Sequence, residues 1–274
     1  MQGECGGLDV DHRGRPKFVA AWLNACEEKD LSPLSPQSLH FEDIAACLQQ
    51  GRKWFAESRQ PAIVYSLLLA LIGLLLIGVV AWLGALPMVY ALISGFMLVG
   101  SVASAGLMAL ALKLEHRQPV RLTDAWAGFA AVPGLWVLSA LAAFLWLIWV
   151  TDAGILYGLY FANEPLRFLP QFGFASETPA FFLFSALMGA VPAAIMLAVA
   201  TFAVPLLLEQ RCTLAQAIVL SVRAVARNPL FMLLWGALVT AGVALSLLLL
   251  PLFLLVFPVL AYASFSCYRR VYPR

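Results

Sequence analysis

The chain has 274 residues, of which 62% are hydrophobic and only 12% are charged. This composition and a mean hydropathy of +0.89 exclude an ordinary soluble domain and predict a protein that crosses a membrane several times. The formal net charge of +2 is uninformative as a total, because in a membrane protein the placement of Lys and Arg decides the orientation.

Residues 1–39 are predicted to form a cytoplasmic arm, followed by a transmembrane domain over residues 40–274. The arm is polar and contains Gly and Pro, and no apolar core follows its basic residues, so we expect no signal peptide. One interpretation is a mobile tail. The alternative is a docking arm, with Phe18 and Trp22 of its one apolar patch as anchors on a partner.

A surface helix, a proline and a long apolar run follow one another in Arg211–Leu234. Thr213 and Gln216 have the spacing of a capping box, which predicts the start of the helix. Asn228-Pro229 ends it, because proline disfavours the α conformation of the residue before it. One face of this helix is apolar and consists of Leu214, Ala217, Ile218, Val222 and Val225, whereas Gln216, Arg223 and Arg227 form the opposite face.

The same plan occurs twice more. His40–Pro61 repeats it with Phe41, Ile44, Ala45 and Leu48 as the apolar face, and Leu122–Pro133 is a shorter version. Each copy is followed by two apolar segments. We therefore expect an all-α, polytopic membrane bundle of six transmembrane helices, arranged as three hairpins that are each preceded by an amphipathic surface helix.

Six apolar segments are long enough to cross a bilayer, since a span needs ~20 residues. They are predicted at residues 62–84, 87–112, 133–151, 180–208, 230–249 and 252–267. We expect the third span to end at the outer interface, just before Asp152. Aromatic residues then form an outward-facing cap that is a candidate partner surface, with Tyr157, Tyr160, Phe168 and Phe172 as its contacts.

Six spans place both termini on the same side of the membrane. Of the 17 Lys and Arg residues, all except Arg167 then fall on that side. Because cytoplasmic loops of membrane proteins carry an excess of Lys and Arg, both termini are predicted to be cytoplasmic.

Small residues recur at helical spacing in three of the spans, and they predict close helix packing. In the fourth span they accompany Pro192 and Pro205, which predict a kink. The packing residues are Ser101 and Ala105 in the second span, Gly189 and Ala190 in the fourth, and Gly236 and Thr240 in the fifth. The alternative for the second span is a ligand pathway lined by its serines.

The ionisable residues argue against chemistry inside the bundle. The three histidines lie in the predicted cytoplasmic segments, so we expect no metal and no cofactor inside the bundle. The five cysteines show no C-x-x-C spacing, so we expect them to be free thiols. Acidic residues such as Glu115 and Asp124 are expected to cap helices and balance basic residues, and we expect no catalytic site. Arg223 and Arg227 are candidate contacts for anionic lipid headgroups.

Several short motifs together resemble a known family. They are Gly95-Phe-Met-Leu-Val-Gly100, Lys113-Leu-Glu115, Val120-Arg-Leu122-Thr-Asp124-Ala125, Pro205-Leu-Leu-Leu-Glu209, Ser221–Pro229, Trp235 and Tyr268-Arg269. Over about Phe41–Arg270 the chain resembles an uncharacterised group of bacterial integral membrane proteins, known as a domain of unknown function, some of which are labelled as a cytochrome c oxidase subunit. The resemblance implies six spans and a bacterial inner-membrane location, and it implies no established activity. The chain departs from the group at Gly100-Ser101, where the group tends to have Gly-Pro, and at Ala261–Ser264, where it tends to have histidines.

These observations favour a non-catalytic accessory or scaffold subunit of a larger membrane complex, such as a respiratory one. Its expected partners are membrane lipids and other membrane subunits, and not nucleic acid. The alternative is a transporter or channel for a neutral or lipid-like substrate, because the kinked fourth helix and the three hairpins can surround a central cavity. A bundle axis packed with Leu, Phe and Met would argue against this alternative.

Overall fold

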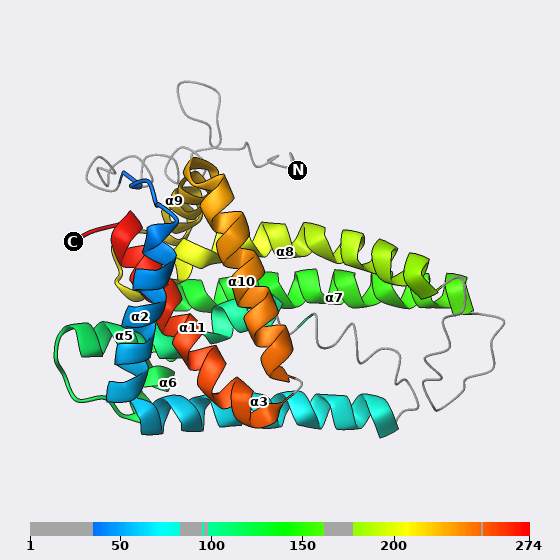
Figure 1. Cartoon of the computed structure of the whole chain (residues 1–274), viewed down its shortest axis with the longest axis horizontal. Helices are drawn as coiled ribbons and strands as arrows, with labels where there is room; N and C mark the ends of the chain where they lie inside the picture. Colours follow the sequence, from blue (N-terminus) through cyan, green and yellow to red (C-terminus); the bar gives the residue numbers. More distant parts are fainter. Residues whose placement is uncertain (1–34, 83–94, 96–97, 162–177, 248) are drawn as a thin grey trace, which may run out of the picture.

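The computed structural model describes residues 35–82, 95, 98–161, 178–247 and 249–274, and these residues form helices without any strand. The surface helices are α2 (Glu42–Glu57), α6 (Leu122–Ala130) and α9 (Leu214–Arg227) (Figure 1). The long helices are α3 (Arg59–Trp82), α5 (Ala105–Glu115), α7 (Pro133–Phe161), α8 (Thr178–Leu208), α10 (Pro229–Leu247) and α11 (Leu250–Val271). The helix that ends as α5 is already helical over most of residues 98–104.

Within the described part of the chain, six helices are long and apolar enough to cross a membrane, which confirms the predicted bundle of three hairpins with preceding surface helices. In chain order, the spans are Arg59–Trp82, Leu98–Glu115, Pro133–Leu156, Leu187–Leu208, Pro229–Ser246 and Pro251–Val271. Val132-Pro133 and Asn228-Pro229 mark the starts of α7 and α10, as their sequence indicates. The first junction differs, because α2 ends at Glu57 and Pro61 lies in the first turn of α3, where proline costs no hydrogen bond.

The third span extends beyond its predicted end at residue 151, since α7 continues to Phe161 without a helix-breaking proline. Asp152 therefore lies within a helix. At 1.5 Å per residue it is about 29 Å from Pro133, which is close to the full hydrocarbon thickness of ~30 Å. The half-buried Asp152 side chain thus still comes near the interface opposite the start of α7.

The six spans divide into an inner and an outer set. The first, third and fifth spans form the outer set, and 17, 28 and 28% of the residues in their apolar stretches are buried. The second, fourth and sixth spans form the inner set, and the corresponding values are 61, 50 and 61%. The inner spans contain many Ala, Gly and Ser residues, which let helices approach closely, whereas the first span is mostly Leu and Ile. In each hairpin, therefore, the first helix is peripheral and the second is central. Figure 1 shows α11 crossing the middle of the molecule, between α3 and the α7–α8 pair.

Each inner span carries one surface helix. The surface helix α6 packs on α5, and α9 packs on α8, so each follows the span that it covers. The corresponding place on α11 is taken by α2, from the other end of the chain. The N-terminal surface helix therefore closes a ring of three similar units.

The three surface helices begin in the same way. In each, a side chain three residues along accepts a backbone N–H: His40 N donates to Asp43 Oδ2 at 2.9 Å, Arg121 N to Asp124 Oδ2 at 2.8 Å, and Thr213 N to Gln216 Oε1 at 3.0 Å.

Two of these capping carboxylates also bind a basic residue at the end of the neighbouring inner span. Lys113 Nζ lies 2.7 Å from Asp124 Oδ1, and Arg270 pairs with Asp43. The hydrogen bond from Lys113, together with the one from the Arg121 backbone, lowers the pKa of Asp124. Caps and ion pairs thus fix where each surface helix meets its span.

Surface helix α9 has three faces rather than two. The face buried in the protein contains Gln216, Ala217, Leu220, Ser221 and Ala224. Val222, on the predicted apolar face, is exposed, whereas Gln216, on the predicted polar face, is only 3% exposed. In α2 the buried residues are Cys47, Gly51 and Trp54, while Phe41 is 60% exposed. The apolar residues left outside in both helices are suited to contact lipid.

Gly51 of α2 packs directly against the backbone of α11. A Cβ at this position would lie 2.6 Å from Val259 O and 2.9 Å from Ala263 N, and both are backbone atoms that cannot turn away. We expect Gly51→Ala to lower the free energy of unfolding by about 1–3 kcal/mol, since it forces two helices apart. Gly73→Ala on α3 is the matched control, because nothing lies within 4 Å of its added Cβ. Thermal unfolding of both variants in detergent checks this, and an equal effect of the two substitutions would contradict it.

Candidate functional site

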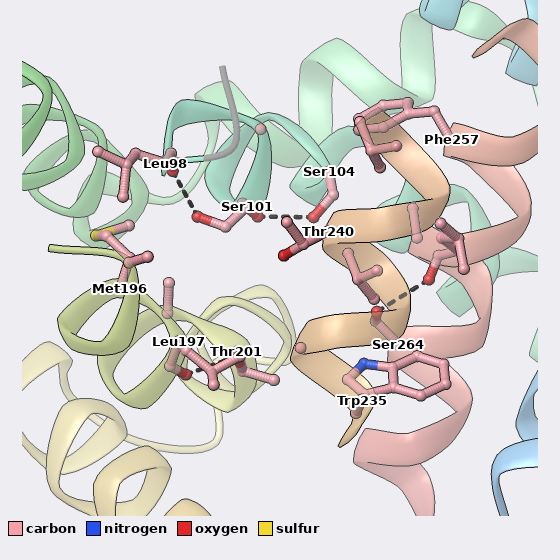
Figure 2. A pocket seen from close by; sticks show the side chains of 18 of the residues that line it. Leu98, Ser101, Ser104, Met196, Leu197, Thr201, Trp235, Thr240, Phe257 and Ser264 are labelled. Atoms are coloured by element: carbon pink, nitrogen blue, oxygen red, sulfur yellow. Dashed lines mark hydrogen bonds between the residues drawn. The ribbon is translucent and has the colours of Figure 1, made fainter. Parts of the chain in front are cut away.

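A cavity of about 160 Å³ lies between the second, fourth, fifth and sixth spans (Figure 2). Most of its wall is apolar, with Met196, Trp235 and Phe257 among the larger side chains. No Asp, Glu, Lys, Arg or His lines it among the described residues. The bundle axis is therefore hollow at this level, and the space is suited to an uncharged ligand.

Five hydroxyl groups line the cavity, and four of them donate to the backbone of their own helix. The Ser101 Oγ donates to Leu98 O at 2.7 Å, and the Ser104 Oγ donates to Ser101 O at 2.7 Å. The Thr201 Oγ1 donates to Leu197 O at 2.6 Å, and the Ser264 Oγ donates to Leu260 O at 2.9 Å. Thr240 is the fifth, and its hydroxyl has no hydrogen bond within the described part of the chain.

The cavity reaches the protein surface between α8 and α10. Ala193 of α8 and Thr240 of α10 both line it and are both exposed. Counted along the helices at 1.5 Å per residue, Thr240 lies about 16 Å from Pro229 and Ala193 about 22 Å from Leu208, so both lie deep within their spans. The opening therefore faces the region of the acyl chains.

Surface helix α9 shapes the wall of this cavity through Ser221. Its Oγ donates to Ala198 O at 2.7 Å and accepts from Phe202 N at 3.2 Å. The hydroxyl is thus inserted between two backbone groups of α8, one turn from Pro205, which itself lacks an N–H. Thr201, which lines the cavity, lies between the two bridged residues.

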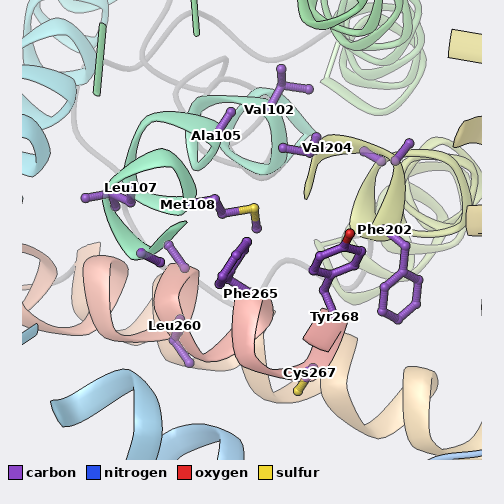
Figure 3. Close-up of a cluster of buried hydrophobic side chains, with 14 of the residues drawn as sticks. Val102, Ala105, Leu107, Met108, Phe202, Val204, Leu260, Phe265, Cys267 and Tyr268 are labelled. Atoms are coloured by element: carbon purple, nitrogen blue, oxygen red, sulfur yellow. The ribbon is translucent and has the colours of Figure 1, made fainter. Parts of the chain in front are cut away.

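A dense apolar layer separates the cavity from the end of the bundle at which the surface helices lie, which we call the basic end. Figure 3 shows Met108 of the second span and Phe265 of α11 pointing toward each other, with Phe202 of α8 beside Tyr268. These side chains are at most 4% exposed. The inner spans are therefore tightly packed between the cavity and the basic end.

Beyond this layer, all three inner spans end in one ion cluster around Arg269. The Nε of Arg269 donates to Glu115 Oε2 at 2.9 Å, and its Nη1 donates to Glu209 Oε2 at 2.9 Å. Its guanidinium also lies over the Phe265 ring, 5.1 Å from the centroid. The Arg269 side chain is 12% exposed and that of Glu209 is 9% exposed. One cation from α11 thus joins the ends of α5 and α8.

Neighbouring polar groups complete the ion cluster. Tyr268 donates to Glu209, and Arg274 lies 3.3 Å from Glu115 Oε2. Arg211 Nη1 donates to Tyr268 Oη at 3.4 Å and to Tyr272 O at 3.4 Å. Burial raises the pKa of Tyr272, so its hydroxyl stays protonated and donates to Leu220 O at 2.8 Å.

The segment before α2 is fixed at the same end by Asn228. Leu39 N donates to Asn228 Oδ1 at 2.7 Å, and Asn228 Nδ2 donates to Gln37 O at 3.3 Å. Gln37 N in turn donates to Val271 O at 3.0 Å. The end of the predicted N-terminal arm is therefore held between α11 and the junction of α9 with α10.

The structure places the predicted packing residues in different surroundings. Ser101, Gly236 and Thr240 line the cavity. Ala105 is fully buried. Gly189 packs against Trp149, because an added Cβ at this glycine would lie 3.1 Å from the Trp149 ring. Ala190 is exposed.

The other predicted site residues are less well defined. Arg223 and Arg227 lie exposed on α9, with no ion pair among the described residues. Phe18, Trp22, Phe168 and Phe172 lie outside the described residues, as do the side chains of Tyr157 and Tyr160.

The serines of the second span, Ser101 and Ser104, both line the cavity, as the alternative of a serine-lined pathway expected. Sequence reasoning missed Thr201, Trp235 and Ser264 as cavity residues, because nothing in their spacing distinguishes a cavity wall from a packed interface. Sequence reasoning also did not connect Glu115, Glu209 and Arg269, although all three lie in the short motifs that carry the family resemblance.

Comparison with known proteins gives one match. Residues 88–209 match the model of a family described as "Predicted integral membrane protein (DUF2189)". No curated protein and no solved structure matches the chain. The match confirms the resemblance to an uncharacterised multi-span membrane family, and with six candidate spans it identifies an integral, multi-pass membrane protein. The matched segment contains Glu115 and Glu209 and stops before their shared partner Arg269.

Removing Arg269 should destabilise the bundle strongly, because it leaves Glu115 and Glu209 without their common cation. We expect Arg269→Ala to lower the free energy of unfolding by about 3–5 kcal/mol, the range for breaking a buried ion pair. Arg270→Ala is the control, since its pair with Asp43 is more exposed and should be worth at most ~1 kcal/mol. Chemical unfolding in mixed micelles measures both values. Similar losses for the two variants would show that the ion cluster does not hold the inner spans together.

Proposed function

We propose that the protein binds a small neutral or lipid-like molecule inside the membrane and moves it through the bundle, as a transporter or channel. The observation that carries the proposal is the cavity between the inner spans and α10. A protein that served only as a packed scaffold would have no need of such a space, since helix interiors normally leave few voids. The proposal contains no catalytic step.

The position of the opening supports a substrate that is already dissolved in the bilayer. It lies between α8 and α10, at Ala193 and Thr240, deep within both spans. The wall has no ionisable group among the described residues, which favours an uncharged substrate and argues against coupling to protons through the cavity.

The layer around Phe265 and the ion cluster of Arg269 close the basic end of the bundle. Passage to that side would require the inner spans to separate there, as in transporters whose repeats rock against each other. By the positive-inside rule we propose that this end faces the cytoplasm, in a bacterial inner membrane.

A second candidate function is the accessory subunit. It is supported by the first span, of which only 17% is buried within the chain. Leu71 and Leu75 of α3 are 51% and 69% exposed, so this helix offers an apolar face on which another membrane subunit can pack. The predicted partner contacts in the N-terminal arm and the aromatic cap would add to this face.

One experiment distinguishes the two functions. The protein is extracted from its native membrane in mild detergent, separated by size, and analysed by mass spectrometry for both lipids and proteins. The transporter proposal predicts a solitary or self-associated particle that retains a neutral lipid-like molecule. Thr240→Phe, which fills the mouth of the cavity, should lower that molecule's occupancy by about tenfold or more, because it removes the space for apolar contacts.

Leu233→Phe is the matched control, since Leu233 lies on the same helix, is 69% exposed and does not line the cavity. Equal occupancy in the two variants, or no retained molecule in either, would contradict the transporter proposal. A stoichiometric partner protein without a retained molecule would instead support the accessory subunit.

A further inference from the structure

The hydroxyl groups of four cavity residues are already used as hydrogen-bond donors within their own helices. Ser101, Ser104, Thr201 and Ser264 each use their single O–H on a backbone carbonyl of their own helix. A hydroxyl oxygen that has donated its hydrogen still carries acceptor lone pairs. Toward the cavity these four residues can therefore accept hydrogen bonds but cannot donate them.

Two further groups supply donors. The Thr240 hydroxyl and the Trp235 indole Nε1 make no hydrogen bond within the described residues. Figure 2 shows the Thr240 oxygen and the Trp235 nitrogen turned toward the space between the helices. The cavity thus surrounds its occupant with four acceptors and two donors, none of them charged.

The size and the opening limit the shape of the occupant. A volume of about 160 Å³ is close to that of the engineered cavity of ~150 Å³ that holds one benzene molecule. Phe257 and Trp235 provide aromatic surface in the wall. The opening between Ala193 and Thr240 leads to the acyl-chain region, so a tail too long for the cavity can extend into the bilayer.

Resting on the function proposed above, we propose that the cavity selects a neutral amphiphile with a ring-sized, hydroxyl-bearing headgroup and an apolar tail in the membrane. A phenolic or alcoholic O–H donates to one of the four serine and threonine oxygens and accepts from Trp235 or Thr240. An ether or a hydrocarbon of the same shape cannot donate to any of the four oxygens. Sites that bond a hydroxyl reject analogues that lack it, because buried polar groups are then left without partners.

The test compares a para-alkylphenol with the para-alkylanisole of the same chain length. In the anisole a methoxy group replaces the hydroxyl, so the oxygen can accept a hydrogen bond but cannot donate one. The full-length protein in phosphatidylcholine nanodiscs is titrated with each compound, and bound ligand is counted by native mass spectrometry. We expect the phenol to bind about tenfold or more tightly than the ether.

Alanine variants assign the preference to the cavity hydroxyls. At least one of the variants Ser101→Ala and Ser264→Ala should weaken phenol binding by about three- to tenfold, and both should leave ether binding unchanged. Ser139→Ala is the matched control, because the Ser139 Oγ also donates to its own helix, to Leu135 O at 2.8 Å, but does not line the cavity. This control should change neither affinity.

The other outcomes separate the two proposals. Equal binding of phenol and ether would overturn the hydrogen-bond selection while leaving the proposed function standing. No binding of either compound would overturn both. A preference for the phenol that is unchanged in Ser101→Ala and Ser264→Ala would overturn the assignment to these hydroxyls.

Discussion

The bundle depends on one cation at the point where three helices end. Arg269 of α11 binds Glu115 at the end of α5 and Glu209 at the end of α8, and its guanidinium lies on the Phe265 ring. A half-buried ion cluster of this kind adds less to stability than its contacts suggest, because desolvation offsets much of the attraction. What it does provide is geometry: it fixes which three spans are central and at which level they meet.

The remaining architecture follows from that inner triad. The Ala-, Gly- and Ser-rich inner helices approach closely near the basic end, and the layer of Met108 and Phe265 fills the space between them. Farther from the ion cluster the helices separate, and α10 borders a cavity. Charges, apolar core and hydroxyl-lined cavity thus follow one another along the same helices. This order is the physical basis for proposing a ligand that enters from the bilayer and a closed basic end.

Local features were predictable from the sequence, and long-range ones were not. The caps of α6 and α9 and the proline at the start of α10 depend on residues within four positions of each other, so the spacing of Asp124 or Gln216 reveals them. Arg269 lies 154 residues from Glu115, and no pattern in one sequence pairs them. The division of α9 into one apolar and one polar face was incomplete, because a surface helix with a protein side and a lipid side has two apolar faces. Gln216 is buried because its Oε1 accepts the Thr213 N–H.

The division into inner and outer spans is the central claim, and nitroxide spin labels in a bilayer test it most directly. In a chain without native cysteines, labels placed one by one along α3 and α11 report their contact with oxygen dissolved in the lipid. The account predicts high oxygen accessibility around most of α3, including Leu71 and Leu75, and low accessibility at Phe253 and Leu260 of α11. Equal accessibility along the two helices would contradict an inner triad, and with it the cavity that the triad encloses.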